Sequence, residues 1–155
     1  MKIGLLGFGK VGKTIAMMIS QDEYFSLEWV LRKKEVLEGR SVSEVLNFES
    51  NDKGIIYSSL LITIDELLDK HPVDFIIDFS TSSFVNVYGK IAAERKIKII
   101  SAISNYKEEE LSLLKKLSKV TTVFWSPNIT FGVNYLIFAA KFLTQLENSF
   151  LTFFS

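Results

Sequence analysis

Apolar residues along the chain form two kinds of pattern, which alternate with each other. Short continuous apolar runs are typical of strands buried in a parallel sheet, and they occupy residues 3–6, 27–31, 54–57, 73–79, 98–100 and 120–125. Apolar residues at helical spacing predict helices at residues 10–20, 43–48, 64–68, 84–91, 105–118 and 131–147. Strands that alternate with helices predict an α/β fold, with a mainly parallel sheet and right-handed crossovers. In such a fold, ligands bind at the carboxyl ends of the strands.

The helical segments also predict buried faces and N-terminal caps. In the first helix, the buried stripe is expected to be Val11, Ile15, Met18 and Ile19. In the helix at 84–91, it is expected to be Phe84, Val87, Tyr88 and Ile91. Thr63 or Asp65 is expected to cap the helix at 64–68, and the hydroxyl groups of residues 80–82 are natural caps for the next helix. Asn105, with Glu108 three residues later, predicts a capping box for the helix at 105–118.

The first fourteen residues, MKIGLLGFGKVGKT, combine an apolar run, a glycine-rich turn and the start of a helix. Residues 7–12 match the pattern G-x-G-x-x-G. In this pattern Gly7 permits the tight turn, Gly9 lets the backbone approach a pyrophosphate, and Gly12 lets the helix pack closely on the strand. The free N–H groups and the positive end of the helix dipole favour an anion at this point. The motif therefore predicts a Rossmann-type, doubly wound sheet in a single domain that binds a dinucleotide.

The same stretch also satisfies the P-loop pattern G-x-x-x-x-G-K-T over residues 7–14. In that alternative, Lys13 would reach the terminal phosphates of a nucleoside triphosphate and Thr14 would hold Mg²⁺. The apolar run that ends at Asp78 could then supply the metal-binding aspartate of a Walker-B strand. A P-loop NTPase that uses these three residues is therefore an alternative function.

Basic residues follow the second predicted strand, at the position that distinguishes the two nicotinamide cofactors. In dinucleotide-binding folds, an acid about twenty residues beyond the glycine motif binds the ribose 2′-hydroxyl of NAD, whereas an arginine accommodates the 2′-phosphate of NADP. This chain has Arg32, Lys33 and Lys34 there, and its first acid, Glu35, comes later. The sequence therefore predicts NADPH, in preference to NADH, as the cofactor.

Composition narrows the other classes of function. The chain has 155 residues, no cysteine, and 18 basic against 18 acidic residues. Balanced charge gives no electrostatic reason to expect a nucleic acid or an anionic membrane, and no apolar run reaches the ~18 residues of a membrane span. The lack of cysteine excludes thiolate metal centres and is compatible with a reducing cytosol. The single histidine, His71, is expected in a surface loop. We therefore expect a cytoplasmic protein with no metal, nucleic acid or membrane partner.

The C-terminal region carries more apolar surface than one helix face can bury. The helix expected at 131–147 has a second apolar face with Tyr135, Phe138 and Phe142, and an apolar tail follows at residues 150–154. A helix that is apolar on more than one face should be covered on more than one face. We therefore expect a dinucleotide-binding domain at 1–130, a linking helix and tail at 131–155 that begin a missing or truncated second domain, and a homo-oligomer formed through this region.

Three segments resemble the 4-hydroxy-tetrahydrodipicolinate reductase (dihydrodipicolinate reductase) family of bacterial lysine biosynthesis. They are residues 7–13 (GFGKVGK), 77–80 (IDFS) and 126–134 (SPNITFGVN). The third is the most specific, since it looks like the family's Ala-Pro-Asn-Phe-Ser-x-Gly-Val-Asn segment. The resemblance implies a Rossmann domain that binds NADPH or NADH, reduction of a cyclic imine or enamine dicarboxylate by hydride transfer, and a homotetramer.

The resemblance also assigns the cofactor-binding residues. The pyrophosphate would be held by Gly7, Phe8, Gly9, Lys10, Val11 and Gly12, and the adenosine ribose or its phosphate by Arg32 and Lys33. The middle of the cofactor would lie at Phe79 and Ser80. The nicotinamide would face Ser101, Ala102, Ile103, Ser126, Asn128 and Ile129.

Two departures from the family pattern bear on function. The loop that is usually Gly-Thr-Thr-Gly is Ser101-Ala-Ile-Ser104 here, so a bulky Ile103 is expected near the nicotinamide. The family's His-His-x-x-x-Lys and Ser-Gly-Thr stretches, which supply the acid and the substrate contacts, have no counterpart in these 155 residues, so no catalytic residue is assigned. The sequence thus predicts the NAD(P)H-binding domain of a reductase of this family without its catalytic substrate domain. The alternative is a non-catalytic, dimeric NADP-binding module.

Overall fold

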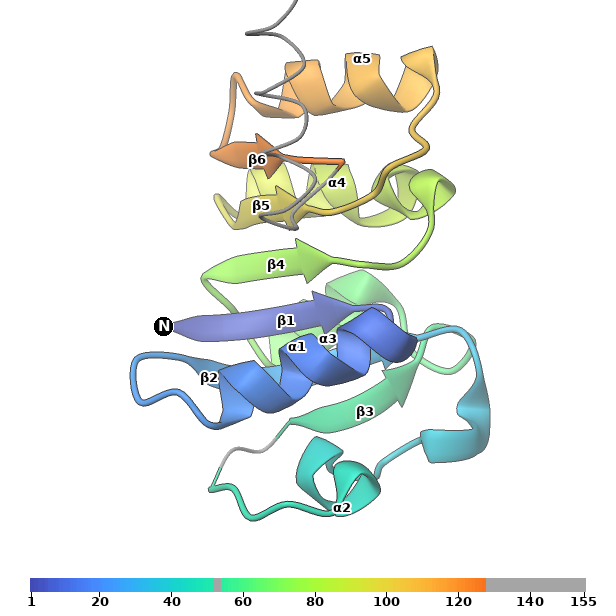
Figure 1. Cartoon of the computed structure of the whole chain (residues 1–155). Coiled ribbons are helices and arrows are strands. Elements are labelled where there is room, and N and C mark those ends of the chain that lie inside the picture. The colour runs from blue at the N-terminus through green and yellow to red at the C-terminus, as the bar shows by residue number, and fades with distance from the viewer. Residues whose placement is uncertain (52–53, 128–155) are drawn as a thin grey trace, which may run out of the picture.

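The computed structural model of the chain describes residues 1–51 and 54–127, and it contains one six-stranded parallel sheet (Figure 1). Along the sheet the strands lie in the order β3-β2-β1-β4-β5-β6. Their bounds are β1 Lys2–Leu6, β2 Ser26–Arg32, β3 Ile55–Ser58, β4 Phe75–Asp78, β5 Lys98–Ser101 and β6 Val123–Trp125. This arrangement confirms the predicted α/β, Rossmann-type fold. The expected helix at 131–147 and the apolar tail lie outside the described residues.

Helices cover both faces of the sheet, so it is doubly wound. Helices α1 (Lys10–Ser20) and α2 (Val42–Leu46) lie on one face, in front of the sheet in Figure 1. Helices α3 (Ile64–Lys70), α4 (Val85–Glu94) and α5 (Glu108–Leu117) pack against the opposite face. Two short 3-10 turns, η1 (Glu35–Leu37) and η2 (Ser82–Phe84), follow β2 and β4. None of the helices described is long and apolar enough to cross a membrane.

Trp29 of β2 is the largest fully buried side chain of the described residues. It belongs to the core between the sheet and helices α3 and α4. Its ring occupies the space beside Gly4 of the neighbouring strand, where an added Cβ would lie 2.2 Å from Trp29 Cζ2. The indole Nε1 donates a hydrogen bond to the carbonyl oxygen of His71 over 3.0 Å. A buried indole with its one donor satisfied stabilises the fold through both packing and hydrogen bonding. His71 follows directly after α3, as its C-cap. It is half-buried, with its Nε2 3.0 Å from Tyr57 Oη, whereas the sequence analysis expected it on the surface.

The buried faces of two helices differ from those that the apolar spacing predicts. Helix α1 buries Gly12, Ala16 and Ile19, whereas Val11 and Met18 are more than half exposed. Helix α4 buries a face of small residues together with Tyr88 and turns Val87 to solvent. The two predicted stripes were therefore wrong in part. Small side chains let a helix axis approach the sheet closely, which turns the larger side chains beside them outward.

Helix caps were predicted correctly at one of three places. Thr63 caps α3 in a capping box with Glu66, as expected. The hydroxyl of Ser80 does not cap the next helix, because it donates to Asp78 Oδ1 instead. Helix α5 begins at Glu108, and Glu110 accepts a hydrogen bond from the backbone N–H of Lys107, so the predicted cap at Asn105 was also wrong.

The strand order reverses between β1 and β4, which are paired from Ile3 with Phe75 to Leu6 with Asp78. After these two strands the chain leaves for opposite faces of the sheet, to α1 and α4. Such a switch point opens a crevice at the carboxyl ends of the strands.

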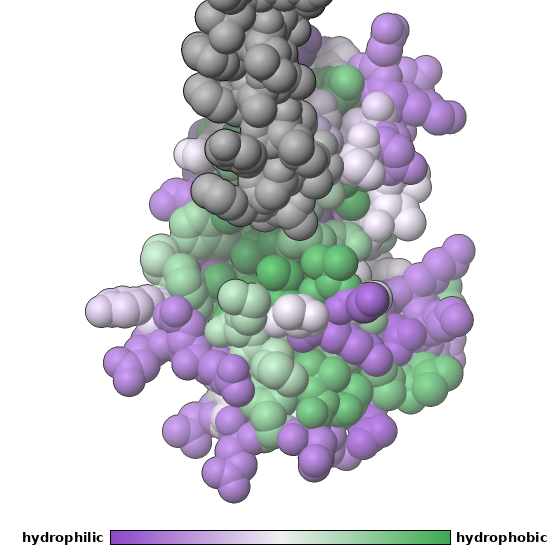
Figure 2. Space-filling view, viewed as in Figure 1, coloured by the Kyte–Doolittle hydropathy of each residue, from purple (hydrophilic) through white to green (hydrophobic). Residues whose placement is uncertain are grey.

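On the viewed side of the molecule, hydrophobic surface lies among hydrophilic side chains (Figure 2). Phe75 and Ile77 of β4 are half-buried with the core that α1 covers, and Phe124 of β6 is 56% exposed.

Candidate functional site

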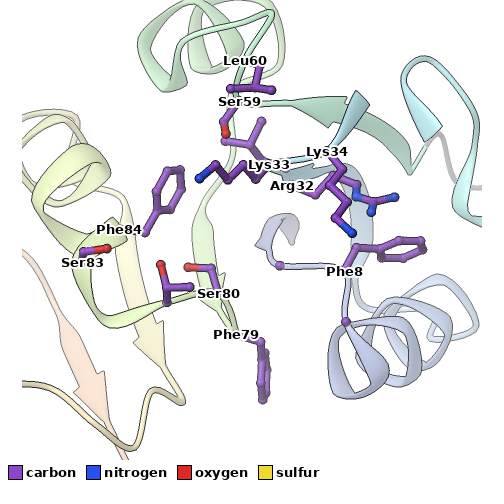
Figure 3. A pocket seen from close by; sticks show the side chains of 14 residues that line it. Phe8, Arg32, Lys33, Lys34, Ser59, Leu60, Phe79, Ser80, Ser83 and Phe84 are labelled. Atoms are coloured by element: carbon purple, nitrogen blue, oxygen red, sulfur yellow. The ribbon is translucent and has the colours of Figure 1, made fainter. Parts of the chain in front are cut away.

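A pocket of about 550 Å³ opens at the carboxyl ends of β1, β2, β3 and β4, at the switch point of the sheet (Figure 3). Its lining residues come from the last two residues of β2 and from the segments that follow the four strands. They are Gly7, Phe8, Gly9, Leu31, Arg32, Lys33, Lys34, Ser59, Leu60, Phe79, Ser80, Thr81, Ser83 and Phe84.

The glycine loop is shaped so that its backbone is open to the pocket. Gly7 has a φ of +93°, which disfavours a side chain, and an added Cβ would lie 2.6 Å from the carbonyl oxygen of Phe79. Gly9, the N-cap of α1, has no heavy atom within 4 Å of an added Cβ, so its face toward the pocket is empty space. The first N–H groups of a helix have no partner within the helix, and they favour an anion there. The loop therefore fits a phosphate group held by backbone N–H donors.

Three cations line the side of the pocket near β2, and no acid is among its lining residues. Figure 3 shows Lys33 extending into the space between Ser59 and Phe84, with Arg32 and Lys34 nearer Phe8. None of these cations forms an ion pair with a residue of the described chain. The nearby Glu38 carboxylate instead accepts a hydrogen bond from the Ser58 backbone N–H at the end of β3. The pocket is thus positive and suited to a second anionic group.

The turn after β4 is held by a buried carboxylate. Asp78 is fully buried, and its Oδ1 accepts hydrogen bonds from Ser80 N (2.8 Å) and Ser80 Oγ (2.5 Å). Burial raises the pKa of Asp78, and the hydrogen bonds from Ser80 oppose that rise only in part. Tyr88 of α4, also fully buried, has a pKa well above its usual value because of burial and the nearby negative charge of Asp78. Asp78 therefore positions Ser80 at the pocket wall.

The residues of the P-loop alternative are arranged differently from a triphosphate site. Helix α1 already begins at Lys10, so Lys13 lies inside the helix, with its Nζ 5.7 Å from the centroid of the Phe8 ring. The Thr14 hydroxyl donates back to the carbonyl oxygen of Lys10. Asp78 is buried against Ser80. This geometry and the strand order argue against the P-loop alternative.

The loop after β5 is bound to its surroundings. The Ser101 hydroxyl lies 2.8 Å from Tyr106 Oη, and the Ala102 N–H donates to the carbonyl oxygen of Asp78. The carbonyl oxygen of Ile103 accepts a hydrogen bond from Trp125 Nε1 over 2.9 Å. The Ile103 side chain is itself buried, with 5% of its surface exposed, and it does not line this pocket. Its expected position near the nicotinamide stays a prediction.

The structure brings some of the predicted cofactor residues together and separates others. Those that line the pocket are Gly7, Phe8, Gly9, Arg32, Lys33, Phe79 and Ser80. Those that do not line it are Lys10, Val11, Gly12, Ser101, Ala102, Ile103 and Ser126. Gly12 instead packs α1 on the loop, and Ser126 donates its N–H to the carbonyl oxygen of Ser101. Asn128 and Ile129 lie outside the described residues.

Several residues of the pocket were missed by the sequence analysis: Leu31, Ser59, Leu60, Thr81, Ser83 and Phe84. Lys34, named there only among the basic residues after the second strand, also lines the pocket. Ser59 and Leu60 directly follow β3, and the pairing of Arg32 with Ser58 brings them to the basic residues. The end of an apolar run signals such a loop, but only the strand order shows which loops meet.

A comparison with protein families identifies the chain. The family described as dihydrodipicolinate reductase, N-terminus, matches residues 1–129. The chain belongs to this family. The expected family resemblance is therefore confirmed.

Curated relatives of this chain are named 4-hydroxy-tetrahydrodipicolinate reductase. One, from Caldanaerobacter subterraneus subsp. tengcongensis, is 29% identical over 143 residues, which are 92% of this chain and 49% of the relative. Another, from Oceanobacillus iheyensis, is 27% identical over 145 residues, 90% of this chain and 52% of the relative. The chain thus spans about half the length of the curated relatives it matches.

Solved structures share the fold at low sequence identity. A dipicolinate-bound dihydrodipicolinate reductase from Paenisporosarcina sp. matches with a TM-score of 0.60 and 18% identity, over 82% of this chain and 47% of that chain. A myo-inositol dehydrogenase from Corynebacterium glutamicum matches with a TM-score of 0.62 and 19% identity, over 94% of this chain and 41% of that one. These matches show that the fold is common to several dehydrogenases and reductases.

Proposed function

We propose that this chain binds NADP(H) and is the cofactor-binding part of an oxidoreductase that resembles 4-hydroxy-tetrahydrodipicolinate reductase. One observation carries the proposal: the pocket at the switch point joins the open backbone of Gly9 to three cations, with no acid among its lining residues. The backbone at Gly9 suits a pyrophosphate, and the three cations suit a 2′-phosphate.

In this proposal, each wall of the pocket binds one part of the cofactor. The N–H groups at the start of α1, beside Gly9, bind the pyrophosphate. Arg32 and Lys33 bind the 2′-phosphate of the adenosine ribose, where an arginine can form a bidentate contact. The turn of Phe79 and Ser80 contacts the middle of the cofactor. The cofactor, when bound, would supply the hydride, and no residue of this chain is assigned a catalytic role.

The remaining expectations belong to the proposal as well. A homo-oligomer through residues 131–155, a cytoplasmic location and a second, catalytic domain are predictions from the sequence and the family. The non-catalytic binding module differs from the reductase in one respect, which is that it binds the cofactor without transferring hydride.

Calorimetric titration of the chain with NADPH, NADH and MgATP tests the proposed function. NADPH should bind at least about tenfold more tightly than NADH, because a charge-assisted hydrogen bond contributes roughly 1.5–3 kcal/mol. Arg32→Ala should reduce this preference. Arg40→Ala is the matched control, since Arg40 is paired with Glu44 and does not line the pocket. Equal affinities for NADPH and NADH, or tighter binding of MgATP, would contradict the proposal.

A further inference from the structure

One face of the strands β4, β5 and β6 carries a row of apolar side chains, on the side of the sheet where α1 lies. Successive residues of a strand point to opposite faces of the sheet, so Phe75 and Ile77 of β4 share this face, and Ile100, paired with Ile77, lies on it as well. All three side chains are half-buried, and Phe75 and Ile77 pack against the core that α1 covers. Phe124 of β6, which is paired with Ile100, lies at the edge of the row and is 56% exposed. We name Phe75, Ile77 and Ile100 the apolar face.

The alternate residues of these strands, on the opposite face, are covered by helices. Ile76, Ile99 and Val123 lie in the core that the sheet forms with α4 and α5. In Figure 1, α1 lies in front of β1 and β2, and none of the described helices lies in front of β5 or β6. The strands of a parallel sheet are normally covered on both faces, because helices pack on each side. The apolar face therefore requires a cover other than the helices that the structure describes.

The segment that directly follows β6 starts beside this face. Ser126 donates its N–H to the carbonyl oxygen of Ser101 over 3.0 Å, so the chain passes the carboxyl end of β6 next to β5. The helix that the sequence predicts at 131–147 begins a few residues later, and at about 1.5 Å per residue it would be about 25 Å long. The three strands lie about 4.8 Å apart, so they span only about 10 Å from the first axis to the last. A helix in this segment is therefore long enough to cross the whole face.

The sequence of this segment predicts a helix with two opposite apolar sides. One side is aliphatic and recurs at intervals of three and four residues: Val133, Leu136, Ile137, Ala140 and Leu143. The other side is aromatic and lies about half a turn away: Tyr135, Phe138 and Phe142. Branched aliphatic side chains around the small Ala140 allow a helix to pack closely on a sheet. The aliphatic side therefore matches the apolar face.

We propose that residues 131–147 dock as a helix on the apolar face of their own chain, with the aliphatic side on Ile77 and Ile100 and the aromatic side outward. The segment is then part of the sheet domain, and its aromatic side is the surface that a second copy of this chain binds. Phe79 continues the row of Phe75 and Ile77 and lines the pocket, so the docked helix also borders the pocket wall. The inference involves no bound nucleotide and does not depend on the proposed function.

The chain has no cysteine, so a single introduced thiol reports whether the apolar face is covered. In the full chain, Ile100→Cys should react with a maleimide at least about tenfold more slowly than Val87→Cys, whose position on α4 is 52% exposed. Leu136→Asp places a charge on the aliphatic side and should raise the rate of Ile100→Cys at least about fivefold. Phe138→Asp is the matched control on the aromatic side and should leave that rate within about twofold.

Three results would overturn the inference. Ile100→Cys that reacts as fast as Val87→Cys would show that the apolar face is open. A rate that rises on dilution of the chain, or that rises equally for Leu136→Asp and Phe138→Asp, would show that a second copy covers the face. A rate that Leu136→Asp leaves unchanged would show that a different segment covers it.

A thiol in the core shows that the domain stays folded in these variants. Ala92→Cys, at a fully buried position of α4, should stay unreactive in each of them. If Leu136→Asp makes Ala92→Cys reactive, the milder pair Leu136→Ala and Phe138→Ala gives the same comparison, with the same direction expected. The dilution measurement uses neither substitution in the predicted helix, so it tests the inference independently of both.

Discussion

A Cβ atom on Gly12 would lie 2.3 Å from the carbonyl oxygen of Gly7. Helix α1 therefore rests directly on the loop that forms the floor of the pocket, and the first residue of that loop touches the helix through a backbone atom. Because Gly7 also packs against the carbonyl oxygen of Phe79, the loops after β1 and β4 are held together at this point. The position of the candidate phosphate site is thus set by the close backbone packing of two glycines, Gly7 and Gly12.

The first prediction separates packing from binding within the glycine loop. Gly12→Ala should lower the free energy of unfolding by about 1–3 kcal/mol, because a methyl group is forced into a filled space. Gly9→Asn should leave the free energy of unfolding within about 1 kcal/mol of the wild type, since Asn is a favoured N-cap and the space there is open. Urea unfolding and NADPH titration check both variants.

In the same pair of variants, NADPH affinity should fall at least about tenfold for Gly9→Asn, whose side chain occupies the place of the phosphate. A Gly9→Asn protein that is stable and binds NADPH normally would show that the phosphate does not lie at this loop.

The second prediction concerns the contact between Gly4 and Trp29 in the core. Gly4→Ala places a methyl group 2.2 Å from the indole and should destabilise the chain by about 1–3 kcal/mol. Trp29→Leu should also destabilise it, through lost packing and a lost hydrogen bond to His71. Since the smaller side chain makes room for the methyl group, the double variant should be more stable than the sum of the two losses predicts, by about 0.5–3 kcal/mol. Additive losses in urea unfolding would contradict this packing.

The third prediction is a pH dependence of stability that comes from Asp78. Its pKa is raised above the ordinary value of 3.8 in the folded chain, chiefly by burial, so the folded chain binds this proton more tightly than the unfolded chain does. The contribution of Asp78 to stability is therefore fully present below pH 3.8 and is lost as the pH rises through its raised pKa.

Asp78→Asn isolates this effect, because the amide oxygen can still accept the hydrogen bonds from Ser80. As the pH falls from about 7 toward 4, the wild type should gain stability relative to this variant. Urea unfolding of both proteins over this range measures the difference. A difference in unfolding free energy that does not change with pH would mean that Asp78 titrates at its ordinary value.

The fourth prediction concerns self-association through the C-terminal region, which lies outside the described residues. Replacing Phe138 and Phe142 by serine should shift the chain toward monomer in sedimentation velocity and leave NADPH affinity unchanged, because the sequence predicts these aromatic residues on a second apolar helix face. Phe124→Ser is the matched control, since Phe124 is an exposed aromatic residue of β6. A wild-type chain that sediments as a monomer at high concentration would refute the prediction.

The sequence by itself determined the elements that depend on neighbouring residues. The apolar run before Gly7 and the spaced glycines predicted a strand, a tight turn and a helix N-terminus, because glycine alone tolerates the positive φ of Gly7 at low cost. The apolar runs indicated all six strands, and Thr63 with Glu66 three residues later formed the capping box that local hydrogen bonding favours. The basic residues Arg32, Lys33 and Lys34 also predicted a preference for NADPH, which stays a prediction.

Only the tertiary structure decided the features that depend on contacts between distant segments. The strand order brought Ser59 and Phe84 to the same pocket as Gly9, although long stretches of chain separate them. Close approach of α1 to the sheet decided that Gly12 and Ala16 are buried and that Val11 is exposed, against the order that hydrophobicity alone predicts. Hydrogen bonds that involve Tyr106 and Trp125 hold the loop after β5. The physical reason is the same in each case. The local sequence pattern determines which secondary structure a segment favours, whereas packing and hydrogen bonding between distant segments determine which side chains are buried and which loops meet.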